Sequence, residues 1–160
     1  MEQVKGLQQV LEPVKDTVEG LFAQWITGQF NQSLTGLNFS KLRVIATHYM
    51  PYPSVPMSDL SWLEVPMFKN VRTIITDLDR GQEYWKHALK LGRVDVLKKV
   101  PNLKHMVFTT YVRFLKEGIQ PELIEAFKYH GVQCHLFETL TSDEILKLDL
   151  ELNGPMEISH

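Results

Sequence analysis

The sequence contains a single cysteine, Cys134, among its 160 residues, so the chain cannot form an internal disulfide. That residue stands in an apolar run, V-Q-C-H-L-F. A lone thiol in such a run is typical of a small core side chain rather than a catalytic nucleophile. Disulfides accumulate in oxidising compartments, so we expect a reducing, intracellular environment and predict a cytoplasmic protein.

Long apolar runs are also missing. No run approaches the roughly 20 residues that a membrane-spanning helix needs. The first residues, M-E-Q-V-K-G-L-Q-Q, lack the continuous apolar core of a secretory signal. An excess of one sign of charge is missing as well, because the net charge is −2 and the pI is near 6.3. Nucleic-acid binders usually carry a basic excess, so we expect neither a nucleic-acid nor a membrane partner.

Metal-ligand patterns are absent too. The six histidines show no H-x-x-x-H or H-x-H spacing, and no carboxylate pair completes a ligand set, so we predict no metal. What remains is ordinary globular composition, 44% hydrophobic and 22% charged. We predict one α/β domain of three segments: an N-terminal helical segment (1–38), strand-helix repeats (39–140) and a C-terminal helix with a tail (141–160).

Four short apolar segments bounded by turn residues predict strands at 42–47, 71–76, 103–109 and 132–137. Such uninterrupted runs are typical of parallel strands covered on both faces. Helical periodicity predicts a main N-terminal helix at 13–30 and further helices at 58–63, 82–100, 121–131 and 141–148. Gly92 is expected to divide the helix at 82–100. The alternating L-D-L-E-L at 148–152 predicts a short edge strand.

The strand segments form an internal repeat. L-R-V-I-A-T, V-R-T-I-I-T and L-K-H-M-V-F-T each read apolar, basic, any residue, two apolar residues, then a threonine close behind, and the four segments begin 29, 32 and 29 residues apart. A unit near 30 residues builds either a solenoid or an open parallel sheet. F-K-N-V-R-T-I-I and P-N-L-K-H-M-V-F resemble the leucine-rich repeats of F-box-type proteins, over about 39–138. The resemblance implies a non-catalytic scaffold that binds another protein.

The segment I-I-T-D-L-D also resembles the first motif of haloacid-dehalogenase-type phosphotransferases. That resemblance implies Asp77 as nucleophile, Asp79 as acid and base, Thr109 at the hydroxyl motif, Lys116 as the lysine, and magnesium as cofactor. Both aspartates would face one pocket, because alternate residues of an extended chain point the same way. The other interpretation of D-L-D-R-G is a turn, in which aspartates accept backbone N–H bonds and Gly81 takes a positive φ.

In a parallel sheet, ligands bind beyond the carboxyl ends of the strands. The polar and aromatic residues expected there are His48, Tyr49, Asp77, Asp79, Tyr111 and Glu138. Such a rim is a pocket, a partner surface or a solvated end of the sheet.

We predict a non-catalytic interaction module that uses this rim to bind a protein or a small ligand. A magnesium-dependent phosphoryl hydrolase is the alternative. A third possibility is self-association through the N-terminal helix and its Trp25.

Overall fold

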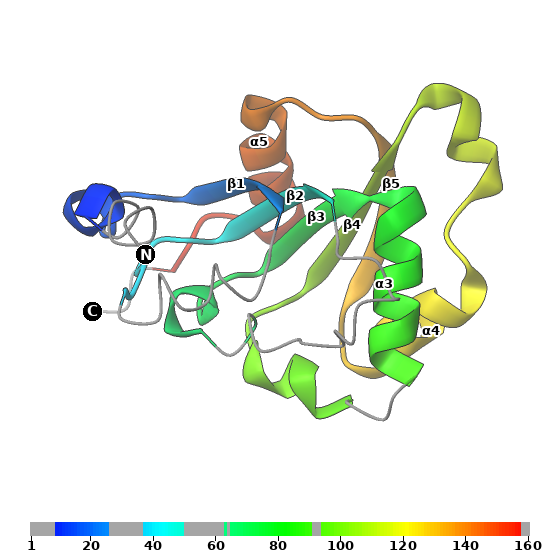
Figure 1. Ribbon diagram of the computed structural model, residues 1–160, viewed down its shortest axis with the longest axis horizontal. Coiled ribbons are helices and arrows are strands. Elements are labelled where there is room, and N and C mark those ends of the chain that lie inside the picture. Colours follow the sequence, from blue (N-terminus) through cyan, green and yellow to red (C-terminus); the bar gives the residue numbers. More distant parts are fainter. Residues whose placement is uncertain (1–8, 26–36, 50–62, 64, 91–93, 158–160) are drawn as a thin grey trace.

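The computed structural model describes residues 9–25, 37–49, 63, 65–90 and 94–157. Five parallel strands form one open sheet in the order β1-β2-β3-β4-β5. Every strand lies beside the strand that precedes it in the sequence, so the sheet grows in one direction only (Figure 1). The strands are Gly20–Trp25 (β1), Val44–Tyr49 (β2), Thr73–Asp77 (β3), His105–Thr110 (β4) and Gln133–Glu138 (β5).

Helices lie on both faces of this sheet (Figure 1). On one face, α3 (Leu78–Lys90) and α4 (Pro121–Tyr129) enclose the larger core, in which Trp85 meets Phe127 edge-on with ring centroids 5.5 Å apart. On the other face, α5 (Ser142–Asn153) encloses a smaller core. The short 3-10 helices are η1 (Glu12–Val14), η3 (Pro66–Phe68), η4 (Val94–Lys99) and η5 (Val112–Glu117).

Alternation along the strands explains the two cores. In β2, Val44 packs under α5 whereas Ile45 packs in the larger core, and β3 repeats the pattern with Ile75 and Ile74. Both neighbours are buried, which is why the strand sequences read as unbroken apolar runs. The α/β fold with a parallel sheet, expected from those runs, is confirmed.

The four predicted strands are all present as β2 to β5, each beginning one or two residues later than expected. The repeat also matches the register, because the basic residue of each unit lies beside that of the next. The Arg72 amide donates to the Arg43 carbonyl at 3.0 Å, and the Lys104 amide donates to the Arg72 carbonyl at 2.9 Å. Aligning the repeats in the sequence therefore aligns them in the sheet.

The predicted N-terminal helix at 13–30 is wrong over its described part. The chain forms η1 and then β1, which pairs with β2 from Gly20↔Val44 to Trp25↔Tyr49. The apolar residues at helical spacing also form a nearly continuous run, G-L-F-A, which suits a strand equally well. Pairing with β2 decides between the two. Gly20 lets α5 lie close to β1, because a Cβ there would lie 2.9 Å from Leu146 Cδ2.

The predicted edge strand at 148–152 is also wrong, because α5 continues through it. Leu148 and Leu152 are four residues apart and face the sheet, whereas Leu150 between them is 43% exposed. The predicted helix start is confirmed: Thr141 and Glu144 form a capping box.

The remaining helix predictions are largely confirmed. The segment expected at 82–100 appears as α3 and η4, on either side of residues 91–93, although α3 begins at Leu78, four residues earlier. The helix expected at 121–131 is α4. The helix expected at 58–63 falls mainly outside the described residues. No helix in the described part of the chain combines the length and apolarity needed to cross a bilayer.

Candidate functional site: a pocket beside α5

The position of α5 is the feature that shapes the candidate site. Leaving β5, the chain passes the carboxyl end of β4, where the Thr139 amide donates to the Thr110 carbonyl at 3.1 Å. The helix then runs back across the sheet, so that Asp149 reaches Thr73 at the start of β3. The N-terminus of α5 therefore lies at the carboxyl edge of the strands, and its last turns lie at the opposite edge.

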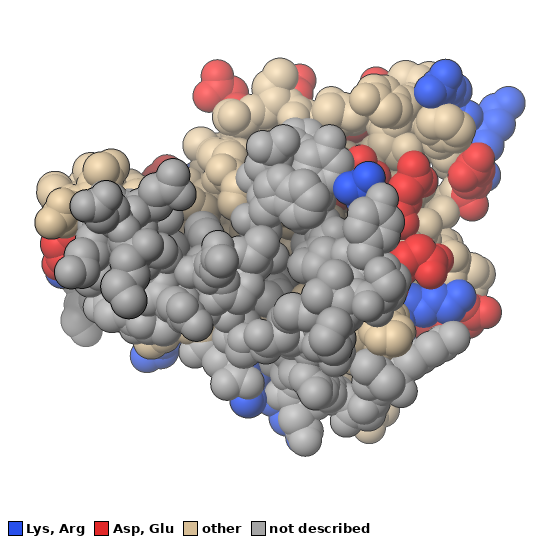
Figure 2. Space-filling view, viewed as in Figure 1, with Lys and Arg blue, Asp and Glu red and all other residues tan. Residues whose placement is uncertain are grey.

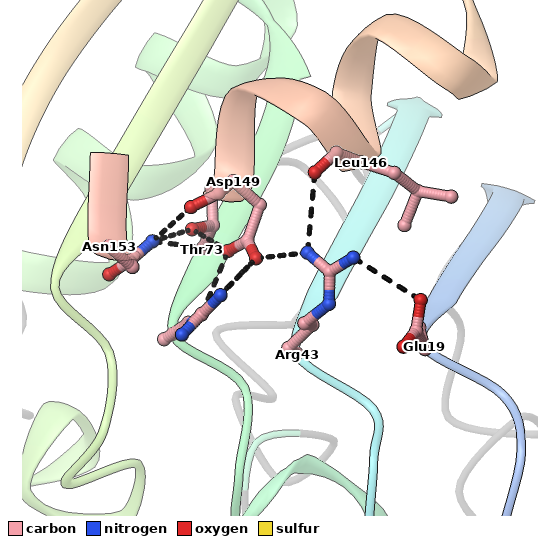
Figure 3. A network of polar contacts seen from close by, with 7 residues as sticks. Glu19, Arg43, Thr73, Leu146, Asp149 and Asn153 are labelled. Carbon is pink, nitrogen blue, oxygen red and sulfur yellow. Dashed lines mark hydrogen bonds and ion pairs between the residues drawn. The ribbon is translucent and has the colours of Figure 1, made fainter. Parts of the chain in front are cut away.

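The last turns of α5 are fixed by a buried polar network (Figure 3). The Asp149 side chain is fully buried and accepts hydrogen bonds from the guanidinium groups of Arg43 and Arg72, the latter at 2.8 Å. The Thr73 hydroxyl donates to the same carboxylate at 2.6 Å, and the Asn153 amide donates at 3.1 Å. A buried carboxylate is tolerated only with such partners, so the network ties α5 to β2 and β3.

Arg43 connects this network to two further groups. Its guanidinium donates to the Leu146 carbonyl at 3.3 Å, inside α5, and to the Glu19 carboxylate at 3.3 Å (Figure 3). Glu19 comes immediately before β1 and is half-exposed. One arginine thus joins the start of β1, the start of β2 and the middle of α5.

The other end of α5 borders a pocket of about 490 Å³. This volume lies within the range of sites that bind small ligands or side chains. Its apolar lining comes from β1, β2, β3, the chain before α5 and α5 itself: Phe22, Ala23, Ala46, Ile75, Leu140 and Ile145. Its polar lining comes mainly from strand ends and the α5 N-terminus: Thr47, Asp77, Thr109, Tyr111, Thr139 and Ser142. Because α5 leaves this part of the sheet face uncovered, Phe22 remains 44% exposed.

Asp77 combines a structural role with its place in the pocket. It is the last residue of β3, and its Oδ1 accepts the Asp79 amide at 3.0 Å. The bond satisfies one of the amides left unpaired at the start of α3. The turn interpretation of D-L-D-R-G is therefore confirmed for Asp77. A carboxylate accepts several hydrogen bonds at once, so this bond is compatible with a ligand in the pocket.

Asp79 does not share this position. It lies in the first turn of α3, is exposed, and is absent from the described lining of the pocket. The expectation that the two aspartates alternate along an extended chain is wrong, because the strand ends at Asp77 and the helix begins at the next residue.

Gly81 has a different role from the one expected. It lies inside α3, and a positive φ occurs only at three other glycines of the described residues. A Cβ at Gly81 would lie 2.6 Å from Thr76 Cγ2, which real structures essentially never show. The glycine is therefore needed for the close contact of α3 with β3, and the positive-φ prediction is wrong.

The other predicted site residues divide into three groups. Thr109 and Tyr111 line the pocket beside Asp77, with Tyr111 67% exposed. Glu138 ends β5 and Lys116 belongs to η5; both are exposed and neither is among the described lining residues. His48 and Tyr49 end β2, but their side chains lie outside the described part of the structure, as does that of Trp25 in β1.

A pair of histidines lies near the end of α5. His105 on β4 and His135 on β5 form a hydrogen bond between Nδ1 and Nε2 at 2.9 Å. Burial lowers the pKa of both imidazoles; for His105 the nearby Asp149 and a backbone hydrogen bond with Leu152 oppose the shift. His105 is thus a hydrogen-bonded, partly buried histidine of the sheet.

Figure 2 shows acidic and basic side chains next to one another along the side of the molecule that α3, α4 and η5 occupy. Within the described residues, no group of three or more histidine, cysteine or acidic side chains is placed to hold a metal ion. Among the described lining residues the pocket has one carboxylate, that of Asp77, whereas magnesium is usually held by one or two carboxylates together with waters and phosphate oxygens.

Comparison with known proteins does not assign the chain to a family. No protein-family model matches it, and no curated protein does. One matching solved structure is the A domain of a carboxylic acid reductase from Segniliparus rugosus, in complex with AMP and a co-purified carboxylic acid, with 13% identity and a TM-score of 0.34. The match covers 91% of this chain but only 21% of that one. A similarity this low carries no functional argument.

Proposed function

We propose that the protein is a non-catalytic interaction module that binds an extended segment of a protein partner in the pocket beside α5. The observation that carries the proposal is the chemistry of this pocket: an apolar lining at the carboxyl edge of a parallel sheet, beside hydroxyl groups and one carboxylate. That edge is where parallel sheets place their ligands. The exposed ring of Tyr111 belongs to a residue type enriched among the side chains that dominate binding energy.

The arrangement of the acidic pair favours binding over hydrolysis. In the hydrolase alternative, Asp77 and Asp79 serve one phosphoryl group, whereas Asp79 lies in the first turn of α3 and outside the described pocket lining. The leucine-rich-repeat interpretation agrees with a binding module and with a sheet that adds strands in one direction.

The test uses a peptide as the probe and a variant that fills the pocket. The probe is acetyl-Ala-Ala-norleucine-Ala-Ala-amide, which presents one apolar side chain on an extended backbone, and its binding is followed by NMR titration. Ala46→Phe adds a ring over the pocket floor, whereas Glu125→Phe adds the same ring to an exposed position of α4.

We expect wild type and Glu125→Phe to bind the peptide with the same affinity, and Ala46→Phe to lose binding. Equal binding by all three proteins would contradict the proposal. Magnesium-dependent turnover of p-nitrophenyl phosphate that disappears in Asp77→Asn would replace the proposal with the hydrolase alternative.

A further inference from the structure

The geometry points to a lysine or arginine side chain, a cationic group on an aliphatic stem, as the anchor that this pocket receives from a partner. The inference rests on the proposed function and adds the chemistry of the ligand. Three features of the described lining carry it: its single charge, its apolar floor and the two aromatic rings at its rim.

The first feature is charge. Among the described lining residues, Asp77 has the one acidic or basic side chain, and it is only partly buried. A carboxylate at the edge of an apolar pocket strengthens binding of a cation and opposes an anion, because the surrounding apolar walls screen the charge less than water does. The pocket is therefore complementary to a positive ligand.

The second feature is the floor. Ala46 on β2, Ile75 on β3 and Ile145 on α5 present methyl and methylene groups to the pocket. Lysine and arginine bury their aliphatic stems along such surfaces while the charged head reaches a polar group. A compact inorganic cation would gain nothing from this floor, so the apolar lining selects for a stem as well as a charge.

The third feature is the pair of rings at the rim. Phe22 and Tyr111 line the pocket from β1 and from the end of β4, and both are exposed. Aromatic faces attract cations, and Tyr111 already has the Arg113 guanidinium 6.0 Å from its ring centroid. Arg113 is one nearby positive charge, and it opposes the inference. Its guanidinium lies closer to Phe114, at 4.6 Å, and Arg113 is exposed, so solvent weakens its repulsion.

Three acetylated and amidated pentapeptides, Ala-Ala-X-Ala-Ala, isolate the contribution of the charge. X is lysine, norleucine or glutamate, so that lysine and norleucine share a stem and differ by the ammonium group. Asp77→Asn removes the pocket charge and keeps a residue that also caps helices well. Asp79→Asn is the matched control, because it removes the same charge from the same turn but outside the described pocket lining.

We expect wild type and Asp79→Asn to bind the lysine peptide about tenfold more tightly than the norleucine peptide, and to bind the glutamate peptide most weakly. In Asp77→Asn the lysine preference should disappear while norleucine binding stays unchanged. Equal binding of lysine and norleucine by wild type, or an equal loss in both variants, overturns this inference and leaves the proposed function standing. Absence of binding by all three peptides overturns both.

Discussion

Arg43 and Asp149 lie 106 residues apart in the sequence and form a buried ion pair between the start of β2 and the buried side of α5. The pair shares its carboxylate with Arg72, which precedes β3. The N-terminus of the same helix borders the pocket at the other edge of the sheet. The network therefore fixes the helix that forms one wall of the candidate site, and its loss should affect both stability and binding.

Asp149→Asn should lower the free energy of unfolding by about 3–5 kcal/mol, because it removes the buried carboxylate that pairs with the guanidinium groups of Arg43 and Arg72 and leaves Arg43 only the half-exposed Glu19. Urea denaturation measures the change. Glu151→Gln on the exposed side of α5 is the control, since its pairing with Lys147 at 3.9 Å lies in solvent and contributes at most about 1 kcal/mol. A loss below about 1 kcal/mol in Asp149→Asn would show that the network does not hold α5.

Gly81→Ala should destabilise the protein by about 1–3 kcal/mol, although alanine favours a helix interior by about 1 kcal/mol. The added Cβ would lie 2.6 Å from Thr76 Cγ2 and 3.0 Å from Thr76 Oγ1. Thr76→Ala removes both atoms, so Gly81→Ala should cost less in that background. Denaturation of the two single variants and the double variant gives the coupling, and simple additivity would contradict the packing explanation.

Stability should fall as the pH is lowered from 7 to 5. The pKa values of His105 and His135 are lowered in the folded protein, so the unfolded chain takes up protons first, beginning near its ordinary histidine pKa of about 6.5. The contribution of the two histidines to the free energy of unfolding is complete above that pH. It decreases below that pH until the folded pKa values are passed. In thermal melts against pH, His135→Gln should reduce this dependence. An unchanged pH profile in His135→Gln would refute the assignment.

Cys134 should resist alkylation in the native protein. Burial raises the pKa of its thiol to about 12, and the thiolate is the reactive form. Iodoacetamide at pH 8 should therefore label the folded protein far more slowly than the urea-unfolded chain, as followed by mass spectrometry. Labelling of the native protein at the unfolded rate would mean that the side chain is accessible.

Local sequence signals were sufficient to predict the strands β2 to β5 and the start of α5. The four strands are uninterrupted apolar runs that contain β-branched residues, and the Thr141–Glu144 capping box involves neighbouring residues only. β1 was missed because its apolar residues also fit a helical period, and its pairing with β2 is contributed by residues more than 20 positions away. The end of α5 was missed for the same reason, since Arg43 and Arg72 bury Asp149 from more than 70 positions away.

The candidate site, like the fold, could be predicted from the sequence only in part. Asp77 and Tyr111 were expected at the rim because they end or follow apolar strands, and both line the pocket. Thr109, expected only as the hydroxyl residue of the hydrolase alternative, lines it as well. Phe22 and Ile145 had no such signal, because their segments were assigned to the wrong element or not connected to the rim. The rule that ligands bind beyond the carboxyl ends of parallel strands therefore identified some of the polar lining residues. The apolar lining depends on where β1 and α5 pack.

The most direct test of the binding site is a map of backbone amide chemical shifts in the labelled protein during addition of the lysine peptide. We predict that the largest changes fall on residues of the pocket lining, Ala23, Ala46, Ile75, Thr109 and Ser142, and that they saturate with a single affinity. Changes concentrated on the exposed face of α4 around Tyr129, or no saturable change at all, would contradict the assignment of this pocket as the binding site.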